Sequence, residues 1–141
     1  MTGLKKALSL FFKRYADFSG RSTRSEFWWV QLVLIIVVVM MGFLIFYFND
    51  SVPLVYGPRP EGVAVSVLAG LMGLAIFVPA IALSVRRFHD RNLSGWWYLG
   101  LGLFQIIPFL GLVATIWIFV ITVSPTKAET NKWGPPPSIV V

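Results

Sequence analysis

The chain has 141 residues, of which 57% are hydrophobic and only 13% are charged. Soluble domains carry about 25% charged residues, so this composition excludes an ordinary soluble domain. The 12 lysines and arginines exceed the 6 acidic residues and give a formal charge of +6. Cysteine is absent, which excludes disulfides and cysteine-based metal sites.

The positive charge is concentrated in clusters between long apolar runs. Residues 1–26 contain six basic and two acidic residues, and residues 86–91 contain three arginines and one aspartate. The segment 49–61 between them has one arginine and two acidic residues. Basic clusters that alternate with apolar runs follow the positive-inside rule, which places both clusters and the N-terminus in the cytoplasm. They do not form the basic patch of a nucleic-acid-binding protein, and we predict no nucleic-acid partner.

The residues before the first apolar run predict a basic amphipathic helix. Its apolar positions have the spacing of one helical face and its polar positions lie opposite: Leu4, Leu8, Phe11, Phe12 and Tyr15 against Lys6, Ser9 and Lys13. Such a helix beside a membrane span lies in the lipid–water interface, with its lysines near the phosphates. The alternative is a solvated helix that packs on nothing. In either case residues 1–26 form a cytoplasmic lead-in.

Two apolar runs are long enough to cross a bilayer. Residues 27–48 would form a helix of about 33 Å, and residues 62–85 one of about 36 Å, against a hydrocarbon core of about 30 Å. The first run is too long for the apolar part of a cleaved signal peptide, so it is predicted to be a retained span.

The third apolar stretch, residues 96–123, would be about 42 Å long as one helix. Pro108 and Gly111 lie in its middle and favour a break. One long tilted helix would leave the C-terminus outside, whereas a hairpin of 93–107 and 109–123 would return it to the cytoplasm. We favour the hairpin. The predicted fold is then an all-α polytopic membrane protein, with an interfacial helix, about four membrane helices within 27–123, and a proline-rich cytoplasmic tail, 124–141.

Two similar motifs border the cytoplasmic ends of the predicted helices. The first, residues 17–29, contains Thr23 and Glu26 at the spacing of a helix capping box. The second, residues 86–97, contains arginines, an Asp90 carboxylate, a capping serine and a tryptophan pair. Both lie on the same predicted side, so their arginines are expected to converge with Glu26, His89 and Asp90.

A family resemblance rests on three motifs: Gly20-Arg21-x-x-Arg24-x-Glu26-Phe27-Trp28, then Arg86-Arg87-Phe88-His89-Asp90 with Ser94-Gly95-Trp96-Trp97, then Asn131-Lys132-Trp133-Gly134. From about Tyr15 to Pro137 the chain resembles the bacterial domain of unknown function 805 family. The resemblance implies a small multi-pass protein of the bacterial inner (plasma) membrane. It implies no reaction.

The sequence offers few groups for catalysis. It has one histidine, no cysteine and six scattered carboxylates, whereas a zinc site needs three or four ligands. We therefore predict no enzyme, no catalytic residue, no metal and no cofactor. Glu26 and Asp90 could pair with arginines only to stabilise the fold, or the arginines could bind phosphate, which guanidinium groups fit bidentately.

The functional hypothesis is a non-enzymatic protein whose arginine- and tryptophan-rich cytoplasmic face binds anionic lipid headgroups or a partner protein. The residues assigned to anion contact are Arg21, Arg24, Arg86, Arg87 and Arg91. Those assigned to orienting ion pairs are Glu26, His89 and Asp90. Those assigned to anchoring at the interface are Trp28, Trp29, Trp96 and Trp97. A homo-oligomer or a membrane-protein partner stays open, and the alternative function is a small oligomeric channel or transporter subunit.

Overall fold

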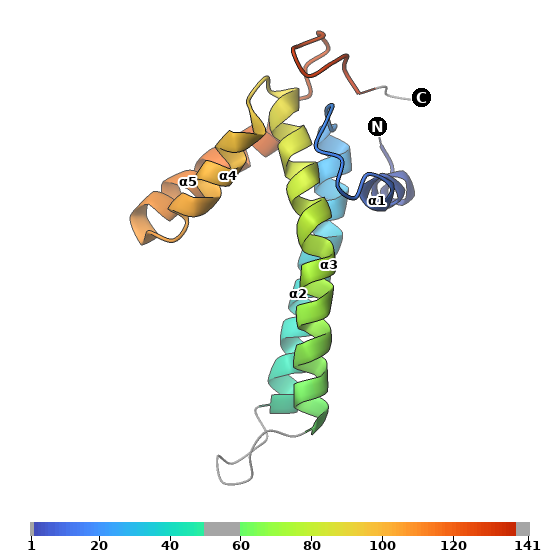
Figure 1. The fold of residues 1–141 in the computed structure, drawn as a ribbon, viewed down its shortest axis with the longest axis vertical. Coiled ribbons are helices and arrows are strands. Elements are labelled where there is room, and N and C mark those ends of the chain that lie inside the picture. Colours follow the sequence, from blue (N-terminus) through green and yellow to red (C-terminus); the bar gives the residue numbers. More distant parts are fainter. Residues whose placement is uncertain (1, 50–59, 138–141) are drawn as a thin grey trace. The chain divides into compact units, whose positions relative to one another are not determined.

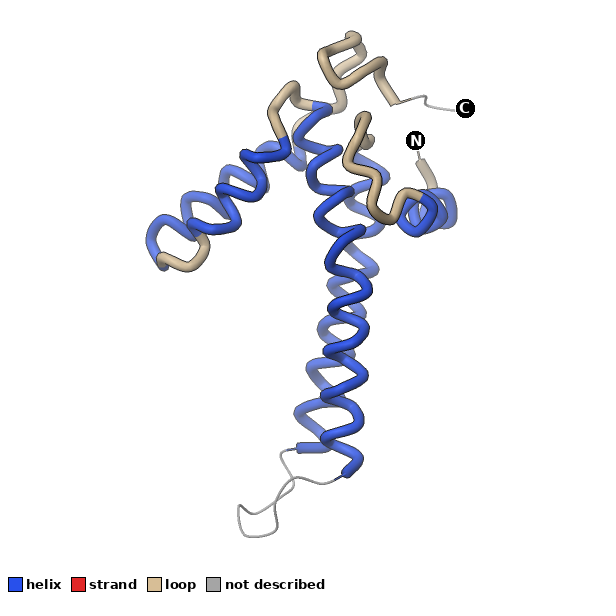
Figure 2. The backbone as a smooth tube through the Cα atoms, in the orientation of Figure 1, coloured by secondary structure: helices blue, strands red, loops and turns tan. Residues whose placement is uncertain are grey.

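Five helices make up the regular structure of the described residues, 2–49 and 60–137, in the computed structural model (Figure 1). They are α1 (Leu4–Lys13), α2 (Arg24–Asn49), α3 (Pro60–Asp90), α4 (Gly95–Phe104) and α5 (Pro108–Val123). Figure 2 shows these helices joined by loops, with no strand in the part of the chain that is described. Most of the predicted connection 49–61 and residues 138–141 of the predicted tail lie outside the described residues.

Helices α2 and α3 are long and apolar enough to cross a membrane. They contain 26 and 31 residues, about 39 and 46 Å of helix. Only 6% of the residues in the most apolar window of each helix are buried in the structure. A helix that is apolar all round and mostly uncovered by protein suits a lipid environment. The predicted all-α membrane fold is confirmed.

The chain divides into two compact units. One, Gln31–Val78, consists of most of α2 and the first part of α3, and side chains of both helices line an apolar groove of about 730 Å³. The other consists of Met1–Val30 and Pro79–Val141. It contains α1, the beginning of α2, the end of α3, both short helices and the tail.

The third apolar stretch forms two helices rather than one. They are α4 and α5, which pack against each other as the predicted hairpin. The chain reverses at residues 105–107, and Pro108 occupies the first turn of α5, where its missing N–H leaves no unsatisfied donor. A Cβ atom at Gly111 would lie 3.0 Å from Cα of Gln105, so α5 begins in close contact with the turn.

Helix α1 packs on the larger unit along one narrow stripe. Ala7 and Phe11 are fully buried, while Leu4, Phe12 and Tyr15 remain exposed. The alternative of a helix that packs on nothing is therefore wrong. The apolar face is therefore divided between positions that are buried against protein and positions that are exposed.

The end of α3 differs from the prediction. The helix does not end at residue 85 but continues for five further residues to Asp90. Arg86, Arg87 and Asp90 therefore lie on a helix and have no exposed surface. Charged side chains are rarely buried unless they are paired, so their partners define the candidate site.

Candidate functional site

The site is a cluster of buried arginines that includes two at the C-terminal end of α3, where Arg86 contacts the N-terminal part of the chain. Its Nε donates to Oγ of Ser22 at 3.2 Å, and its Nη1 donates to the carbonyl oxygens of Arg14 and Asp17. Its Nη2 lies 4.0 Å from a carboxylate oxygen of Glu26. Arg86 thus fastens the connection between α1 and α2 to α3.

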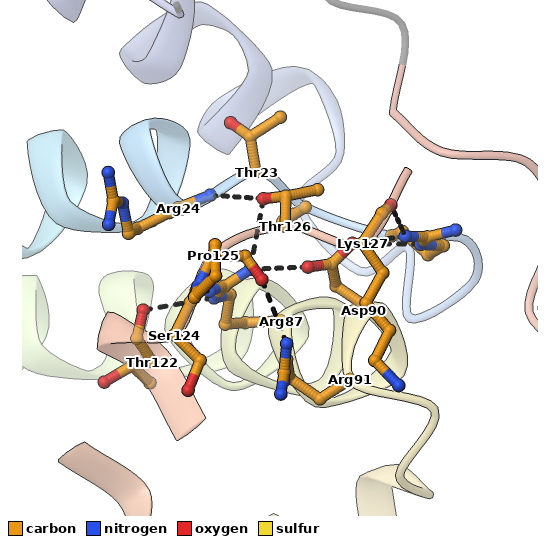
Figure 3. Close-up of polar contacts among 12 residues, drawn as sticks. Thr23, Arg24, Arg87, Asp90, Arg91, Thr122, Ser124, Pro125, Thr126 and Lys127 are labelled. Carbon is orange, nitrogen blue, oxygen red and sulfur yellow. Dashed lines mark hydrogen bonds and ion pairs between the residues drawn. The ribbon is translucent and has the colours of Figure 1, made fainter. Parts of the chain in front are cut away.

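Arg87 contacts the C-terminal part of the chain instead. Its Nε donates to the carbonyl oxygen of Thr122 at 3.2 Å, and its Nη2 donates to that of Ser124. Its Nη1 donates to Asp90 at 2.6 Å, one helical turn away (Figure 3). Neighbouring residues on a helix point about 100° apart. This rotation lets two consecutive arginines hold the two ends of the chain.

Arg21 joins both ends through Asp90. Its Nε and Nη2 donate to one carboxylate oxygen of Asp90 at 3.0 and 2.7 Å, while Arg87 binds the other oxygen. Nη1 of Arg21 donates to the carbonyl oxygen of Glu129 at 2.7 Å, and Nη2 donates to that of Lys127. Asp90 is thus shared by two arginines from segments 66 positions apart in sequence.

The electrostatics of the cluster rest on more than ion pairs. Three buried arginines face only two buried carboxylates, Glu26 and Asp90. The remaining positive charge is compensated by backbone carbonyl oxygens and by the C-terminal end of α3, where the helix dipole favours cations. The carbonyls that accept these bonds belong mainly to residues 122–129.

The predicted capping box is half formed. The backbone N–H of Glu26 donates to Oγ1 of Thr23 at 3.0 Å, as expected. The Glu26 carboxylate does not complete the box but accepts a hydrogen bond from Oγ of Ser22 at 3.2 Å and faces Arg86. Its charge stabilises the arginine cluster rather than the first turn of α2.

His89 lies at the edge of the cluster and holds the last part of the tail. Its ring stacks on Trp133, with centroids 3.6 Å apart and planes 6° from parallel. One ring nitrogen, Nδ1, lies 3.1 Å from the carbonyl oxygen of Gly20, and the His89 carbonyl accepts a bond from the Asn131 amide at 2.9 Å. Gly20 has φ +73°, a conformation that favours glycine. His89 therefore packs as a structural group, with its ring between two segments.

Arg24 and Arg91 differ from the three buried arginines. Arg24 is exposed and Arg91 is half-buried, and neither has a carboxylate partner among the described residues. Arg91 donates from Nη1 to the carbonyl oxygen of Pro125 at 3.0 Å, and the backbone N–H of Arg24 donates to Oγ1 of Thr126 (Figure 3). These two guanidinium groups keep donors that an external anion could use.

An exposed ion pair lies in the connection after α1. Nε of Arg14 lies 2.8 Å from the carboxylate of Asp17, which also accepts hydrogen bonds from the Ser19 side chain and backbone. The Ser19 hydroxyl first, and then Arg14, lower the pKa of Asp17 from 3.8 to about 2. Asp17 is therefore ionised at neutral pH and adds a negative charge to the connection.

The four tryptophans of the motifs have different environments. Trp28 donates from Nε1 to the Thr122 carbonyl at 3.2 Å and packs edge-to-face on Phe119, so it joins α2 to α5. Trp29, Trp96 and Trp97 are exposed, and Trp96 most of all at 79%. For the exposed three the role at the membrane interface stays a prediction, whereas Trp28 contacts protein.

The sequence motifs did not reveal the chain segment that the arginines hold. The acceptors in residues 122–129 are backbone carbonyls, and no side-chain pattern marks them. Asn131 and Trp133 belong to the third sequence motif, so the motif marks them, but the sequence does not show that they contact His89. Within the part of the chain that is described, no three histidine or acidic side chains are grouped to hold a metal ion.

The chain is similar to known inner membrane proteins. A family model described as "Protein of unknown function (DUF805)" matches residues 15–135. The chain is 33% identical to "Inner membrane protein YhaH" of Escherichia coli (strain K12) over 130 residues, which cover 90% of this chain and 92% of the relative. It is 31% identical to "Inner membrane protein YhaI" of the same strain over 125 residues, 89% of each chain. No solved structure matches.

The matched region begins just after α1 and ends in the tail, so it contains the three buried arginines, Glu26 and Asp90, and most of both segments that the cluster joins. The match of the family model to residues 15–135 and the similarity to inner membrane proteins show that this integral membrane protein belongs to the DUF805 family.

Proposed function

We propose that this chain is a non-enzymatic inner-membrane protein whose cytoplasmic face binds anionic phospholipid headgroups. The observation that carries the proposal is that α1 has one buried stripe and one exposed, basic and apolar surface. The buried Ala7 and Phe11 fix the helix to the protein, while Lys5, Lys6 and Lys13 remain exposed beside an exposed Phe12. Lysines beside exposed apolar side chains suit a helix lying at the surface of an anionic leaflet.

The buried arginines have a different part in this proposal. Hydrogen bonds within the chain occupy the donors of Arg21 and Arg87 and most of those of Arg86. They hold the tail and the N-terminal connection in place. Lipid contact is assigned to the lysines of α1 and to Arg24 and Arg91.

The absence of catalysis is supported by how the ionisable groups are used. Asp90 and Glu26 face arginines, and the single histidine of the chain stacks on Trp133. A general acid or base must instead reach a substrate. No specific contact favours the alternative channel or transporter subunit.

Lipid retention by the purified full chain tests the proposal. The protein would be exchanged into nanodiscs containing equal amounts of phosphatidylglycerol and phosphatidylcholine, and the lipids that remain bound in native mass spectrometry would be counted. The wild type should retain mainly phosphatidylglycerol. Each lysine near an anionic surface contributes about 1 kcal/mol, about fivefold, so Lys5→Gln/Lys6→Gln/Lys13→Gln should strongly reduce this preference.

The matched control is Lys127→Gln/Lys132→Gln, which removes exposed lysines from the tail instead of α1. It should keep more of the preference than the α1 variant. A wild type with no preference for phosphatidylglycerol would refute the proposal. Ion flux through liposomes that contain the wild type would favour the channel instead.

A further inference from the structure

A groove along α5 combines the two features that a phospholipid site needs. It has a volume of about 410 Å³, within the usual range for small-molecule sites. Helix α5 and its C-cap residue contribute one continuous face to it: Val113, Ile116, Trp117, Val120, Ile121 and Ser124. These positions follow the spacing i, i+3, i+4, i+7, i+8 and i+11 of a single helical stripe.

The length of the stripe matches one acyl layer. From Val113 to Ser124 the helix rises about 16 Å, and half of the hydrocarbon core of a bilayer is about 15 Å. Its outer end lies beside the arginine cluster, because Ser124 accepts a hydrogen bond from Arg87. The apolar part of the groove therefore begins near the headgroups and ends near the middle of the membrane.

The polar end of the groove contains Arg91. Its guanidinium donates one hydrogen bond, from Nη1 to the Pro125 carbonyl, and no other hydrogen bond or ion pair joins it to the described residues. Nε and Nη2 therefore remain available, and guanidinium groups bind phosphate through paired N–H donors. Arg91 supplies the charge complementarity that an anionic headgroup requires.

Two other hollows lack this combination. The groove in Gln31–Val78 is lined by no charged side chain. The hollow beside Trp133 is lined by Lys132, but that ammonium group lies 5.3 Å over the Trp133 ring. A cation–π contact already compensates its charge. Of these three hollows, only the groove on α5 combines an apolar surface with an arginine that has unused N–H donors.

We propose that this groove binds one anionic glycerophospholipid, with its phosphate on Arg91 and an acyl chain along α5 from Ser124 to Val113. The inference rests on the proposed lipid-binding function and names one site for it. The lysines of α1 would attract the anionic leaflet in general, whereas the groove would hold an individual lipid. The two contributions are separable by mutation.

The test is the affinity of the full chain for added lipid. Delipidated protein in detergent would be titrated with dioleoyl phosphatidylglycerol and, separately, with dioleoyl phosphatidylcholine, and the first bound lipid would be quantified by native mass spectrometry. Arg91→Gln should weaken phosphatidylglycerol binding about tenfold, as expected for loss of a charge-assisted phosphate contact. Lys127→Gln is the matched control, because it also removes a positive charge but from an exposed tail residue that does not line the groove, and it should change binding less than twofold.

A second variant tests the apolar part with Arg91 intact. Ile116 is 55% exposed, so Ile116→Trp can be accommodated without disturbing the core, and it should weaken binding of both lipids by filling the groove. This variant decides the proposal if Arg91→Gln fails to fold, which thermal unfolding in the same detergent would reveal.

Each outcome has one meaning. Equal binding by the wild type and Arg91→Gln, or an equal loss in Lys127→Gln, would overturn the Arg91 site while leaving general lipid binding intact. Unchanged binding by Ile116→Trp would overturn the acyl-chain groove. A wild type that binds phosphatidylglycerol no better than phosphatidylcholine would overturn both this site and the proposed function.

Discussion

Asp90 is the residue on which the buried charges depend most. It is fully buried and accepts hydrogen bonds from Arg21 and Arg87 through its two carboxylate oxygens. Asp90→Asn would leave two buried guanidinium groups without their shared counter-charge. Loss of one partner from a buried ion pair costs about 3–5 kcal/mol. We expect the free energy of unfolding to fall by about this amount, measured by denaturant titration in detergent micelles with tryptophan fluorescence.

Asp17→Asn is the matched control for this experiment. Asp17 also pairs with an arginine, Arg14, but their side chains are 39% and 28% exposed. Exposed ion pairs contribute about 0–1 kcal/mol, so this variant should unfold nearly as the wild type does. Equal stability of the two variants would mean that the Asp90 carboxylate does not hold the cluster together.

At the scale of the helices, spacing and hydrophobicity predicted most of the structure. The amphipathic pattern located α1, the two longest apolar runs located α2 and α3, and Pro108 located the break before α5. The sequence predicts the end of α3 five residues too early, because consecutive arginines are typical of the edge of a membrane span. A helix continues through charged residues when partners distant in sequence compensate them. Those partners, among them backbone carbonyls, leave no periodic signal.

The start of α4 depends on close contact with α3 at Gly95. A Cβ atom there would lie 2.5 Å from one methyl carbon of Val85 and 3.0 Å from the other. Valine in a helix has one strongly preferred rotamer and cannot easily turn away. Gly95→Ala should therefore lower the free energy of unfolding by about 1–3 kcal/mol, the usual cost of overpacking.

Gly100 provides the comparison on the same helix. No atom lies within 4 Å of a Cβ atom placed there, and alanine is favoured over glycine in a helix by about 1 kcal/mol. Gly100→Ala should leave stability unchanged or raise it in the same denaturant titration. If the Gly95→Ala protein is as stable as the Gly100→Ala protein, then the close contact between Gly95 of α4 and Val85 of α3 is not required.

At the scale of the whole molecule, the arginine cluster ties together segments from both ends of the chain. Arg86 holds residues 14–22, Arg87 holds residues 122–124, and Arg21 binds Asp90 and the tail. The sequence motifs predicted that these arginines converge, but they could not distinguish external anions from internal carbonyls as acceptors. Burial makes that distinction, because it depends on packing between distant segments.

The cluster also constrains the topology of the chain. Segments that share buried hydrogen bonds must lie on one side of the membrane, so Lys13 and Lys127, which flank these segments, are expected to be cytoplasmic together. Glu61 lies in the first turn of α3, at the opposite end of a helix of about 46 Å, and should lie on the far side. Helix α4 is only about 15 Å long, so Ile106 at the hairpin turn should not reach the far aqueous phase.

Cysteine labelling tests this topology. The sequence has no cysteine, so single-cysteine variants at Lys13, Glu61, Ile106 and Lys127 can be labelled in intact cells with a membrane-impermeant maleimide. Only Glu61→Cys should react before lysis, and Lys13→Cys and Lys127→Cys only afterwards. Labelling of Lys127→Cys from outside would separate the tail from the N-terminal segment and contradict the cluster, whereas labelling of Ile106→Cys from outside would make the hairpin a full crossing.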